Sequence, residues 1–290
     1  YHVDVRCSDE IFKQLSQNYL KFRNTCKFCL DNLVNFDPDH LVQPDEMLPL
    51  DKWAVTRLNA LIEKVFAAYD EYEFHVVSHM INDFCVVDLS SFYFDIIKDR
   101  LYCGEENGLE RRSAQTAVWL ILDAMTRMFA PILAFTCDEV WLAMPHRAAD
   151  DARNVLFNEM VQPYNGYALS EEEMARWARI AALRTAVNGA LEQARADKTI
   201  GKSLEAEVDL TVTAEDAFLT DMDAAALADV LIVSQVRVDV GAAQSVAVRP
   251  ANGAKCLRCW KVLPTVGSDA GHPELCPRCA AVVKKLPVME

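Results

Sequence analysis

Four cysteines near the end of the chain give its clearest chemical signal. They form two Cys-x-x-Cys pairs separated by sixteen residues: Cys256 with Cys259, and Cys276 with Cys279. A two-residue gap lets both thiolates of a pair reach one tetrahedral ion, and two such pairs about 15 to 20 residues apart are typical of zinc sites. Because four protein ligands leave no open coordination position, we expect one Zn²⁺ with a structural role.

The other six cysteines show no framework spacing and fall in segments with helical patterns: Cys7, Cys26, Cys29, Cys85, Cys103 and Cys137. This distribution favours a reducing compartment, so we expect a cytoplasmic protein. It also disfavours the alternative in which the two tail pairs are disulfides or arise by chance. His272 could replace one cysteine as a ligand, although four equivalent thiols make it unnecessary.

Basic side chains and one tryptophan surround the paired cysteines: Lys255, Arg258, Trp260, Lys261 and Arg278. An aromatic ring held beside guanidinium groups is suited to stacking an unpaired base and holding its phosphate, as in the recognition of single-stranded RNA loops. The candidate RNA-binding residues of this segment are therefore Arg258, Trp260, Lys261 and Arg278. The alternative, that Trp260 packs over the cysteine turns or on a neighbouring domain, stays open.

A second basic stretch, from Arg195 to Leu204, contributes Arg195, Lys198 and Lys202. Its Gly-Lys-Ser matches the end of a phosphate-binding loop, but the earlier glycine is missing and a helix precedes a strand, so we exclude a nucleotide site. Two interpretations remain open for these residues: a surface that contacts a nucleic-acid backbone, and solvated lysines at a helix end.

Two further pairs have metal-ligand residue types without a convincing site. His75 and His79 are four residues apart on one helix, but no third ligand lies nearby in the sequence, so we expect histidines that are in the core or hydrogen-bonded. Cys26 and Cys29 fall within a helical repeat and are expected to be small buried apolar residues.

Net charge limits the kinds of partner. The chain of 290 residues carries −14 at pH 7, which argues against general affinity for nucleic acid. Residues 251–290 alone are net positive, with 6 basic and 3 acidic groups. No apolar run reaches the roughly 18 residues that span a bilayer, so we expect no membrane association. Because the chain opens on Tyr1 without an initiator methionine, it is expected to be part of a larger protein.

Hydrophobic periodicity predicts mainly helices in the first 145 residues. The first helix is predicted from Ser8 to before Asp37, and the second begins at an N-cap at Asp51. A mostly buried helix is predicted from Phe74 to Val87, and another from Ser90 to Arg100. A central helix from Arg111 to Phe129 and a last helix from Pro131 to Met144 follow. Together they predict an antiparallel helical bundle over residues 1–153.

The sequence after residue 153 predicts two smaller domains. Residues 154–250 contain a helix from Ser170 to about Asp197, stopped by Gly201, and then a small α/β unit with strands at 205–213, 235–240 and 244–248 and a helix at 216–231. Residues 251–290 form the zinc-binding domain. The expected fold class is mainly α: a helical bundle, a small α/β subdomain and a four-cysteine zinc finger.

Several motifs carry a resemblance to a known family. They are Tyr19-Leu-Lys-Phe-Arg-Asn-Thr25, Asn32-Leu-Val-Asn-Phe-Asp-Pro38, Asp88-Leu-Ser-Ser-Phe-Tyr93, Lys98-Asp-Arg-Leu-Tyr102, Met128-Phe-Ala-Pro-Ile-Leu133 through Glu139-Val-Trp141, Ile200-Gly-Lys-Ser-Leu-Glu-Ala206, and Cys-x-Arg-Cys-Trp at 256–260. Together they are similar to the anticodon-binding bundle and C-terminal region of class I isoleucyl-tRNA synthetases. The bundle motifs alone leave the valine enzyme as an alternative, and the four-cysteine tail favours isoleucine.

The resemblance implies the tRNA-reading end of an isoleucine-tRNA ligase. In that case Arg258 and Trp260 meet anticodon bases, the partner is tRNA(Ile), and the chain works as a monomer together with upstream catalytic and editing domains. The His-x-Gly-His and Lys-Met-Ser-Lys-Ser signatures of the ATP site do not occur in this sequence. ATP and Mg²⁺ are therefore expected only in the full-length enzyme, and this chain alone is expected to be inactive.

A rival resemblance concerns the tail alone. Its two Cys-x-x-Cys pairs are similar to those of the zinc finger of formamidopyrimidine-type DNA glycosylases, which binds duplex DNA. Those enzymes use an N-terminal proline nucleophile and a β-rich first domain, and this sequence has neither.

Overall fold

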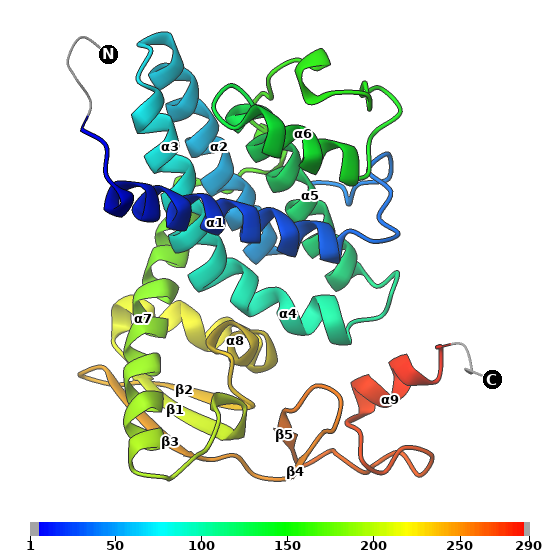
Figure 1. Cartoon of the computed structure of the whole chain (residues 1–290). Helices are drawn as coiled ribbons and strands as arrows, with labels where there is room; N and C mark the ends of the chain where they lie inside the picture. Colours follow the sequence, from blue (N-terminus) through cyan, green and yellow to red (C-terminus); the bar gives the residue numbers. More distant parts are fainter. Residues whose placement is uncertain (1–5, 287–290) are drawn as a thin grey trace. The chain divides into compact units, whose positions relative to one another are not determined.

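The computed structural model describes residues 6–286, so residues 1–5 and 287–290, at the outer ends of the first and third predicted domains, lie outside the described residues. The chain divides into two compact units (Figure 1). The first contains the chain up to residue 101 together with 106–169, and the second contains 102–105 and the chain from 170 onward. Helices dominate, so the predicted mainly α class is confirmed. None of the described helices is long and apolar enough to cross a membrane.

The first unit is a helical bundle, as predicted. Its helices are α1 (Asp9–Asn32), α2 (Pro49–Asp70), α3 (Phe74–Asp83), the π-helix η1 (Phe84–Tyr93), most of α4 (Phe94–Cys103), α5 (Leu109–Phe129) and α6 (Ala134–Ala143), followed by the short 3-10 helices η2 (Val155–Phe157) and η3 (Asn165–Tyr167). The predicted central helix is confirmed, because every residue of α5 from Ser113 to Phe129 is buried. The predicted start of α1 is also confirmed, since the Ser8 hydroxyl accepts a hydrogen bond from the Ile11 amide.

The predicted N-cap at Asp51 is wrong. Helix α2 begins two residues earlier, at Pro49, and the Asp51 carboxylate lies fully buried inside the bundle. It accepts hydrogen bonds from the Tyr93 hydroxyl at 2.7 Å, from the Ser113 hydroxyl at 2.5 Å and from both terminal nitrogens of Arg100 at 2.9 Å. A carboxylate without water needs such donors, so Asp51 joins helices α2, η1, α4 and α5 in the core.

The predicted break between Val87 and Ser90 is also wrong. Residues 74–103 are helical without interruption, because the π-helix η1 connects α3 to α4. The Ser91 hydroxyl donates to the carbonyl oxygens of Val86 and Val87, at 2.8 Å each. A π-turn displaces backbone carbonyls from their usual partners, so Ser91 satisfies them inside the helix and does not start a new one.

The histidine prediction fails in the same helix. His75 and His79 are both exposed, and neither imidazole side chain forms a hydrogen bond among residues 6–286. The predicted helix is not mostly buried either, since only four of the residues 74–87 are buried. By contrast, Cys26 and Cys29 are buried in the bundle core, as predicted.

Helix α6 starts later than predicted. Pro131 lies in a turn after α5, in which the Leu133 amide donates to the Phe129 carbonyl at 2.8 Å, and helix geometry begins only at Ala134. Proline suits the first turn of a helix but also suits a turn, and the sequence alone did not distinguish the two.

The second unit opens on α7 (Glu171–Ala196), whose predicted start is confirmed by a capping box between Ser170 and Glu173. Its predicted end near Asp197 is confirmed, but Gly201 is not the residue that ends the helix. Lys198 adopts a left-handed backbone with φ 59°, and the Thr199 amide bonds back to the Ala194 carbonyl at 2.9 Å. Lysine therefore occupies a position that usually favours glycine.

A three-stranded sheet follows the 3-10 helix η4 (Ser203–Glu205). Its order is β2 (Gln235–Val240), β1 (Ala206–Val212), β3 (Ser245–Pro250), with β1 parallel to β2 and antiparallel to β3. The three strands were predicted correctly to within a few residues. The predicted helix at 216–231 is correct only in its second half, because a 3-10 helix η5 (Ala214–Asp221) precedes α8 (Ala224–Leu231) and Asp223 caps α8.

The tail of the second unit has little regular structure. It contains the two-residue strands β4 (Ala254–Lys255) and β5 (Val262–Leu263), which pair antiparallel, and the short helix α9 (Pro277–Val283). So little secondary structure cannot support a separate hydrophobic core, and the buried residues of this segment are mainly cysteines.

Candidate functional site

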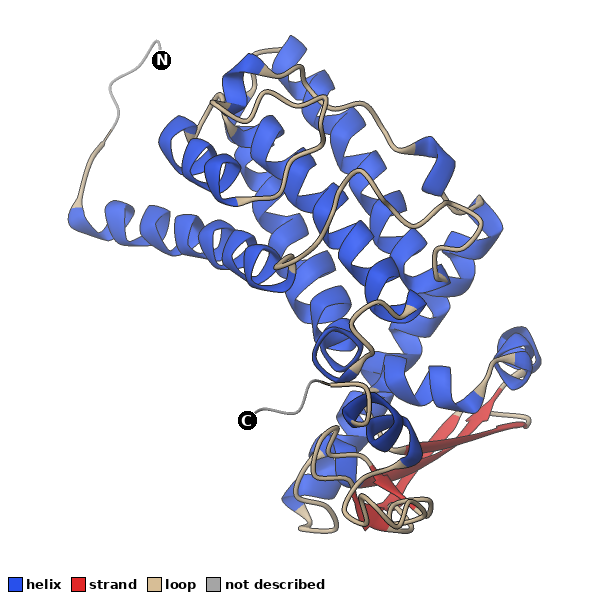
Figure 2. Ribbon diagram, turned by 90° about the vertical axis from the view of Figure 1, so that its right-hand side faces the viewer, coloured by secondary structure: helices blue, strands red, loops and turns tan. Residues whose placement is uncertain are grey.

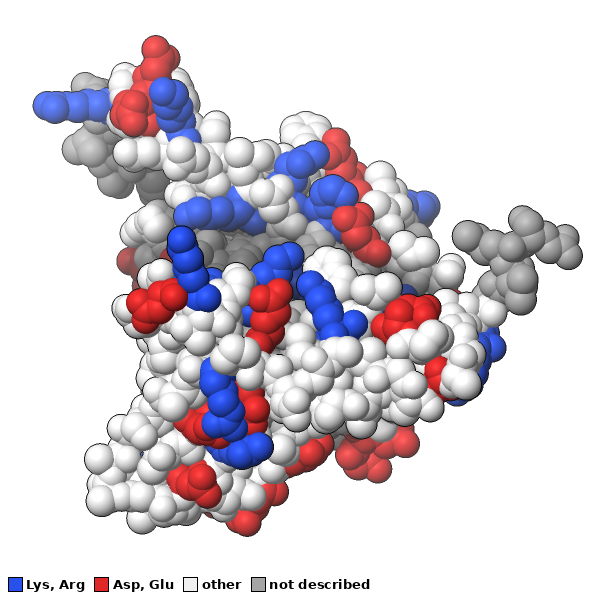
Figure 3. Space-filling view, turned by 90° about the horizontal axis from the view of Figure 1, so that it is seen from below, with Lys and Arg blue, Asp and Glu red and all other residues white. Residues whose placement is uncertain are grey.

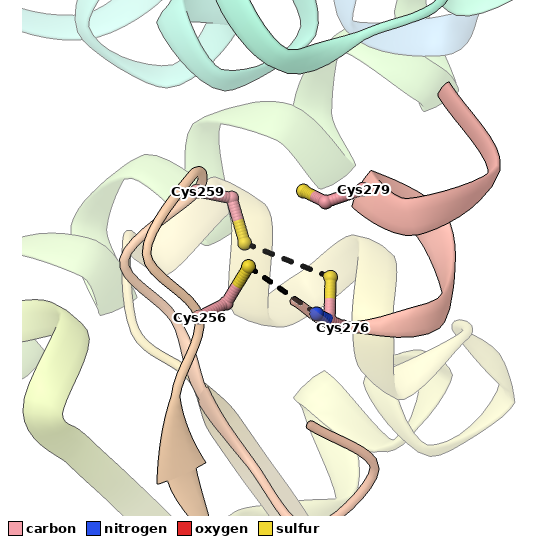
Figure 4. A group of neighbouring side chains, drawn as sticks. All are labelled: Cys256, Cys259, Cys276 and Cys279. Carbon is pink, nitrogen blue, oxygen red and sulfur yellow. Dashed lines mark hydrogen bonds between the residues drawn. The ribbon is translucent and has the colours of Figure 1, made fainter. Parts of the chain in front are cut away.

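The four tail cysteines converge on one point, as predicted (Figure 4). Cys256 and Cys259 come from the turn between β4 and β5, while Cys276 precedes α9 and Cys279 lies in its first turn. All four are buried, and their sulfur atoms lie within 4.8 Å of one another. The Sγ atoms of Cys259 and Cys276 are 3.9 Å apart. Zn–S bonds of about 2.3 Å in a tetrahedron place sulfurs about 3.8 Å apart, so the cluster fits zinc.

Backbone hydrogen bonds shape the first cysteine turn. The Cys256 amide donates to the Lys261 carbonyl and the Trp260 amide donates to the Cys256 carbonyl, both at 2.9 Å. Gly253, just before the turn, has φ 121°, and a Cβ there would lie 2.2 Å from the backbone of Leu263. Only glycine permits this close approach, which brings β4 against β5.

The turn also prepares one thiol as a ligand. Burial alone would raise the pKa of Cys256, but amide groups of Cys259, Cys276 and Arg258 donate toward its sulfur and lower the pKa to about 6. The lowered pKa of Cys256 favours its thiolate, the form that binds metal. Burial raises the pKa of Cys259 and of Cys276, so these thiols deprotonate only when a cation compensates.

The alternatives for the cysteines are not supported. All ten cysteines lie in the described part of the chain and are free thiols, so neither tail pair is a disulfide. Within residues 6–286 the ligand group consists of the four cysteines alone, without His272.

Trp260 is exposed beside the cluster. Its side chain is 58% exposed and its backbone has φ 65°, a conformation that is costly for a bulky residue. The Lys202 ammonium lies 5.7 Å from the centre of the Trp260 ring. Two basic stretches that are separate in the sequence therefore meet at this ring. The interpretation in which Trp260 packs over the cysteine turns does not account for its exposure.

Arg258 faces the interior of the second unit. Its guanidinium donates to the Cys103 carbonyl at 2.5 Å and lies 3.9 Å from the Cys279 sulfur. The Cys103 carbonyl lies at the end of α4 and lacks a helical partner, so Arg258 acts as a cap. The contact spans 155 residues, and sequence reasoning missed Cys103 because no local spacing signals it.

The other predicted basic residues differ in their partners. Lys261 is mostly buried and pairs with Asp229. Arg195 is half-buried and donates to the Ser203 hydroxyl at 3.0 Å and to Glu192 at 2.5 Å. Arg278 is half-buried next to Cys279, whereas Lys198 is exposed at the end of α7.

A glutamate that sequence reasoning did not single out joins the two basic stretches. The Glu205 carboxylate accepts from the amides of Gly201 at 3.0 Å and Lys202 at 3.2 Å, and lies 4.0 Å from the Lys255 ammonium. The amides of Gly201 and Lys202 lower the pKa of Glu205, which keeps it ionised. This carboxylate fixes the turn that presents Lys202 to Trp260.

Charges of both signs are mixed on this side of the protein. Seen from the side on which β3 and β4 lie in Figure 1, Lys and Arg side chains alternate with Asp and Glu, and wide areas are uncharged (Figure 3). An anionic partner is therefore expected to bind through a limited set of contacts and not through a broad positive field.

Two protein families match parts of the chain. The anticodon-binding domain of tRNA ligase matches residues 51–210, more than half of the 290 residues. The zinc finger found in FPG and IleRS matches residues 253–282, which include all four clustered cysteines.

Curated relatives match almost the whole chain. An isoleucine--tRNA ligase of Geobacter sulfurreducens is 45% identical over 298 residues, which cover 98% of this chain and 32% of the relative. Isoleucine--tRNA ligases of Desulforamulus reducens and Moorella thermoacetica are 43% and 42% identical, cover 98% and 99% of this chain, and are themselves covered to 32%. The chain spans about a third of the length of the curated relatives it matches.

Proposed function

Because the chain belongs to the family of anticodon-binding domains of tRNA ligases, we propose that it is the anticodon-reading part of an isoleucine-tRNA ligase. Its partner in this proposal is tRNA(Ile). Aminoacylation, with ATP and Mg²⁺, belongs to the other two thirds of the polypeptide. The chain on its own neither activates isoleucine nor charges tRNA, and the complete enzyme is a cytoplasmic monomer.

The observation that carries the proposal is the exposed Trp260 ring beside the four-cysteine cluster and Lys202. Zinc, when bound, holds the two cysteine turns together as a rigid base. The Trp260 ring stacks on an unpaired anticodon base, and Lys202 and Lys198 contact neighbouring phosphates. Binding energy gained here orients the distant acceptor end, which lowers the entropic cost of the reaction.

The remaining candidate residues support the same surface from within. Arg258, Lys261 and Arg195 have partners within the protein, and Arg278 lies beside the cluster. We propose that they set the position of Trp260 and Lys202 and add positive charge to the surface that binds the RNA. The division into residues 1–153, 154–250 and 251–290 remains our proposal for the functional parts: bundle, connector and zinc domain.

Binding of tRNA by the zinc-loaded chain tests the proposal. We expect a preference for tRNA(Ile) over the same tRNA with an exchanged anticodon, and an affinity that falls steeply between about 50 and 200 mM salt. Duplex DNA should compete poorly. Equal affinity for both tRNAs would contradict anticodon reading, and effective competition by duplex DNA would favour the DNA-binding use of this type of zinc finger.

Truncation of the exposed ring gives a sharper prediction. Trp260→Ala is expected to weaken tRNA binding by about 1–3 kcal/mol, roughly 5- to 150-fold, because one base loses its stacking surface. The measurement is a binding titration with tRNA(Ile) at fixed salt. Leu257→Ala is the matched control, since Leu257 lies in the same turn and is 64% exposed. Equal losses for the two variants would mean that stacking is not the cause.

A further inference from the structure

The backbone of Trp260 is held in an unfavourable conformation from both sides. Its φ of 65° is costly for a bulky residue and persists only where neighbouring residues fix it. On the preceding side, the Trp260 amide donates to the carbonyl of Cys256, one of the four clustered cysteines. On the following side, Lys261 and Val262 contact residues outside the cluster. The position of the ring therefore depends on more than the zinc site.

The second residue after the ring is held by both of its backbone groups. The Ser234 hydroxyl accepts a hydrogen bond from the Val262 amide at 2.7 Å. The Gln235 side-chain amide donates to the Val262 carbonyl at 3.0 Å and to the Asn252 carbonyl at 2.7 Å. Gln235 is the first residue of β2, so the three-stranded sheet holds the tail, whose loops lie beside the red strands in Figure 2.

An ion pair holds the residue directly after the ring. The Lys261 ammonium pairs with the Asp229 carboxylate, and the two side chains are only 12% and 33% exposed. Asp229 lies in the last turn of α8, where the helix dipole disfavours a negative charge. The carboxylate therefore does not stabilise α8 through the dipole, whereas its contact with Lys261 gives it a role at this position.

One buried hydroxyl joins the two stretches of chain that carry the ring and the lysine beside it. Ser234 is 5% exposed, and its hydroxyl donates to the Leu204 carbonyl at 2.5 Å while it accepts from the Val262 amide. Leu204 follows Lys202 by two residues, and Val262 follows Trp260 by two residues. The same side chain therefore helps to fix both partners of the contact between the Lys202 ammonium and the Trp260 ring.

We propose that Asp229, Ser234 and Gln235 are positioning residues for tRNA binding. They hold the backbone after Trp260 so that its ring lies beside Lys202 and is ready to stack on a base, and they do not contact the RNA themselves. The inference rests on the proposed function, in which this ring is the stacking surface. Their partners after Trp260 are 27 to 32 residues away along the chain, so no local spacing signals them.

The sign of one substitution separates positioning from electrostatics. Asp229→Asn removes a negative charge, so charge alone would strengthen the binding of an anion such as tRNA. Positioning requires the opposite result. In a binding titration with the zinc-loaded chain, the affinity for tRNA(Ile) is expected to fall about 3- to 10-fold, because Lys261 loses the partner that holds it.

Asp269→Asn is the matched control for this titration. Asp269 forms an ion pair with Lys284 in the same tail, and its side chain is 23% exposed, similar to Asp229. The substitution removes the same charge without touching the residues after the ring, so the affinity should stay unchanged or rise slightly. An unchanged or higher affinity in Asp229→Asn, or an equal loss in both variants, would overturn the inference.

A second pair of variants tests the buried hydroxyl. Ser234→Ala leaves the Val262 amide and the Leu204 carbonyl without their shared partner and should also weaken tRNA binding. Ser234→Thr keeps the hydroxyl and should restore most of the affinity, whereas equal losses in the two variants would contradict the role of the hydroxyl. Metal analysis should find one zinc per chain in each variant. If Ser234→Ala fails to fold, the partly exposed Asp229→Asn decides the question.

A measurement without tRNA separates this inference from the proposed function. The Lys202 ammonium lies over the Trp260 ring, so the ring current should shift the NMR signals of the adjacent Lys202 methylene protons upfield. Trp260→Ala identifies this shift, which should be lost in Asp229→Asn and Ser234→Ala and kept in Asp269→Asn.

The two kinds of failure then differ. Loss of the shift in Asp229→Asn and Ser234→Ala, together with no anticodon preference in the unaltered chain, would reject the proposed function alone. An intact shift and an unchanged affinity in these two variants, together with a clear anticodon preference in the unaltered chain, would reject the positioning role alone.

Discussion

Removal of zinc is expected to unfold residues 253–283 while the helical bundle stays folded. This segment has two-residue strands, one short helix and a core in which four cysteines are joined by only a few apolar side chains, such as Leu275 and Ala280. Structural zinc contributes about 10–16 kcal/mol in finger peptides, far more than so small a core supplies. Affinity for tRNA should fall at least as far as in Trp260→Ala, because the ring then has no rigid base.

The measurement combines metal analysis with hydrogen exchange. We expect one zinc per chain, released by a chelator together with loss of amide protection over residues 253–283. Cys276→Ser should give the same result without a chelator. Cys7→Ser is the control, because Cys7 is an exposed free thiol outside the cluster. Retained protection over 253–283 in the metal-free chain would show that zinc is not needed for the fold of the segment.

Asp51→Ala is expected to lower the free energy of unfolding of the bundle by about 3–5 kcal/mol. The substitution leaves the Arg100 guanidinium, whose side chain is 11% exposed, without its carboxylate, and it removes the acceptor of the Tyr93 and Ser113 hydroxyls. A buried charge without a partner is strongly destabilising, whereas a surface pair matters little. Urea unfolding followed by helical circular dichroism measures the difference.

The control for this prediction is a surface ion pair in the same bundle. Asp31→Ala breaks the bridge between Lys27 and Asp31, in which both side chains are 61% exposed, and should change stability by at most about 1 kcal/mol. Asp51→Asn keeps the size of the side chain and part of its hydrogen bonding, so it should cost less than Asp51→Ala. A loss below about 1 kcal/mol for Asp51→Ala would contradict the role assigned to the buried carboxylate.

Local signals in the sequence predicted those features that depend on neighbours along the chain. Ser8 and Ser170 were identified as helix starts because capping requires only residues within one turn. The paired cysteines were identified because metal geometry fixes their spacing. The strands β1, β2 and β3 followed from alternation of polar and apolar residues.

Features that depend on distant residues were missed. Asp51 has the composition of an N-cap, and only the positions of Tyr93 and Arg100 explain its burial. Ser90 and Ser91 indicate a helix start, and only the π-geometry of η1 places them within a continuous helix. The basic candidates were chosen by charge alone, so the interior contact of Arg258 with Cys103 could not be foreseen.

The exposure of Trp260 also has an optical consequence. The chain has five tryptophans, and the other four, Trp53, Trp119, Trp141 and Trp177, are all buried with at most 8% of their surface exposed. Indole emission shifts to the red in water, and collisional quenchers reach only accessible rings. The red, quenchable part of the intrinsic fluorescence therefore comes from a single side chain, so occupancy of this surface can be followed in the unlabelled protein.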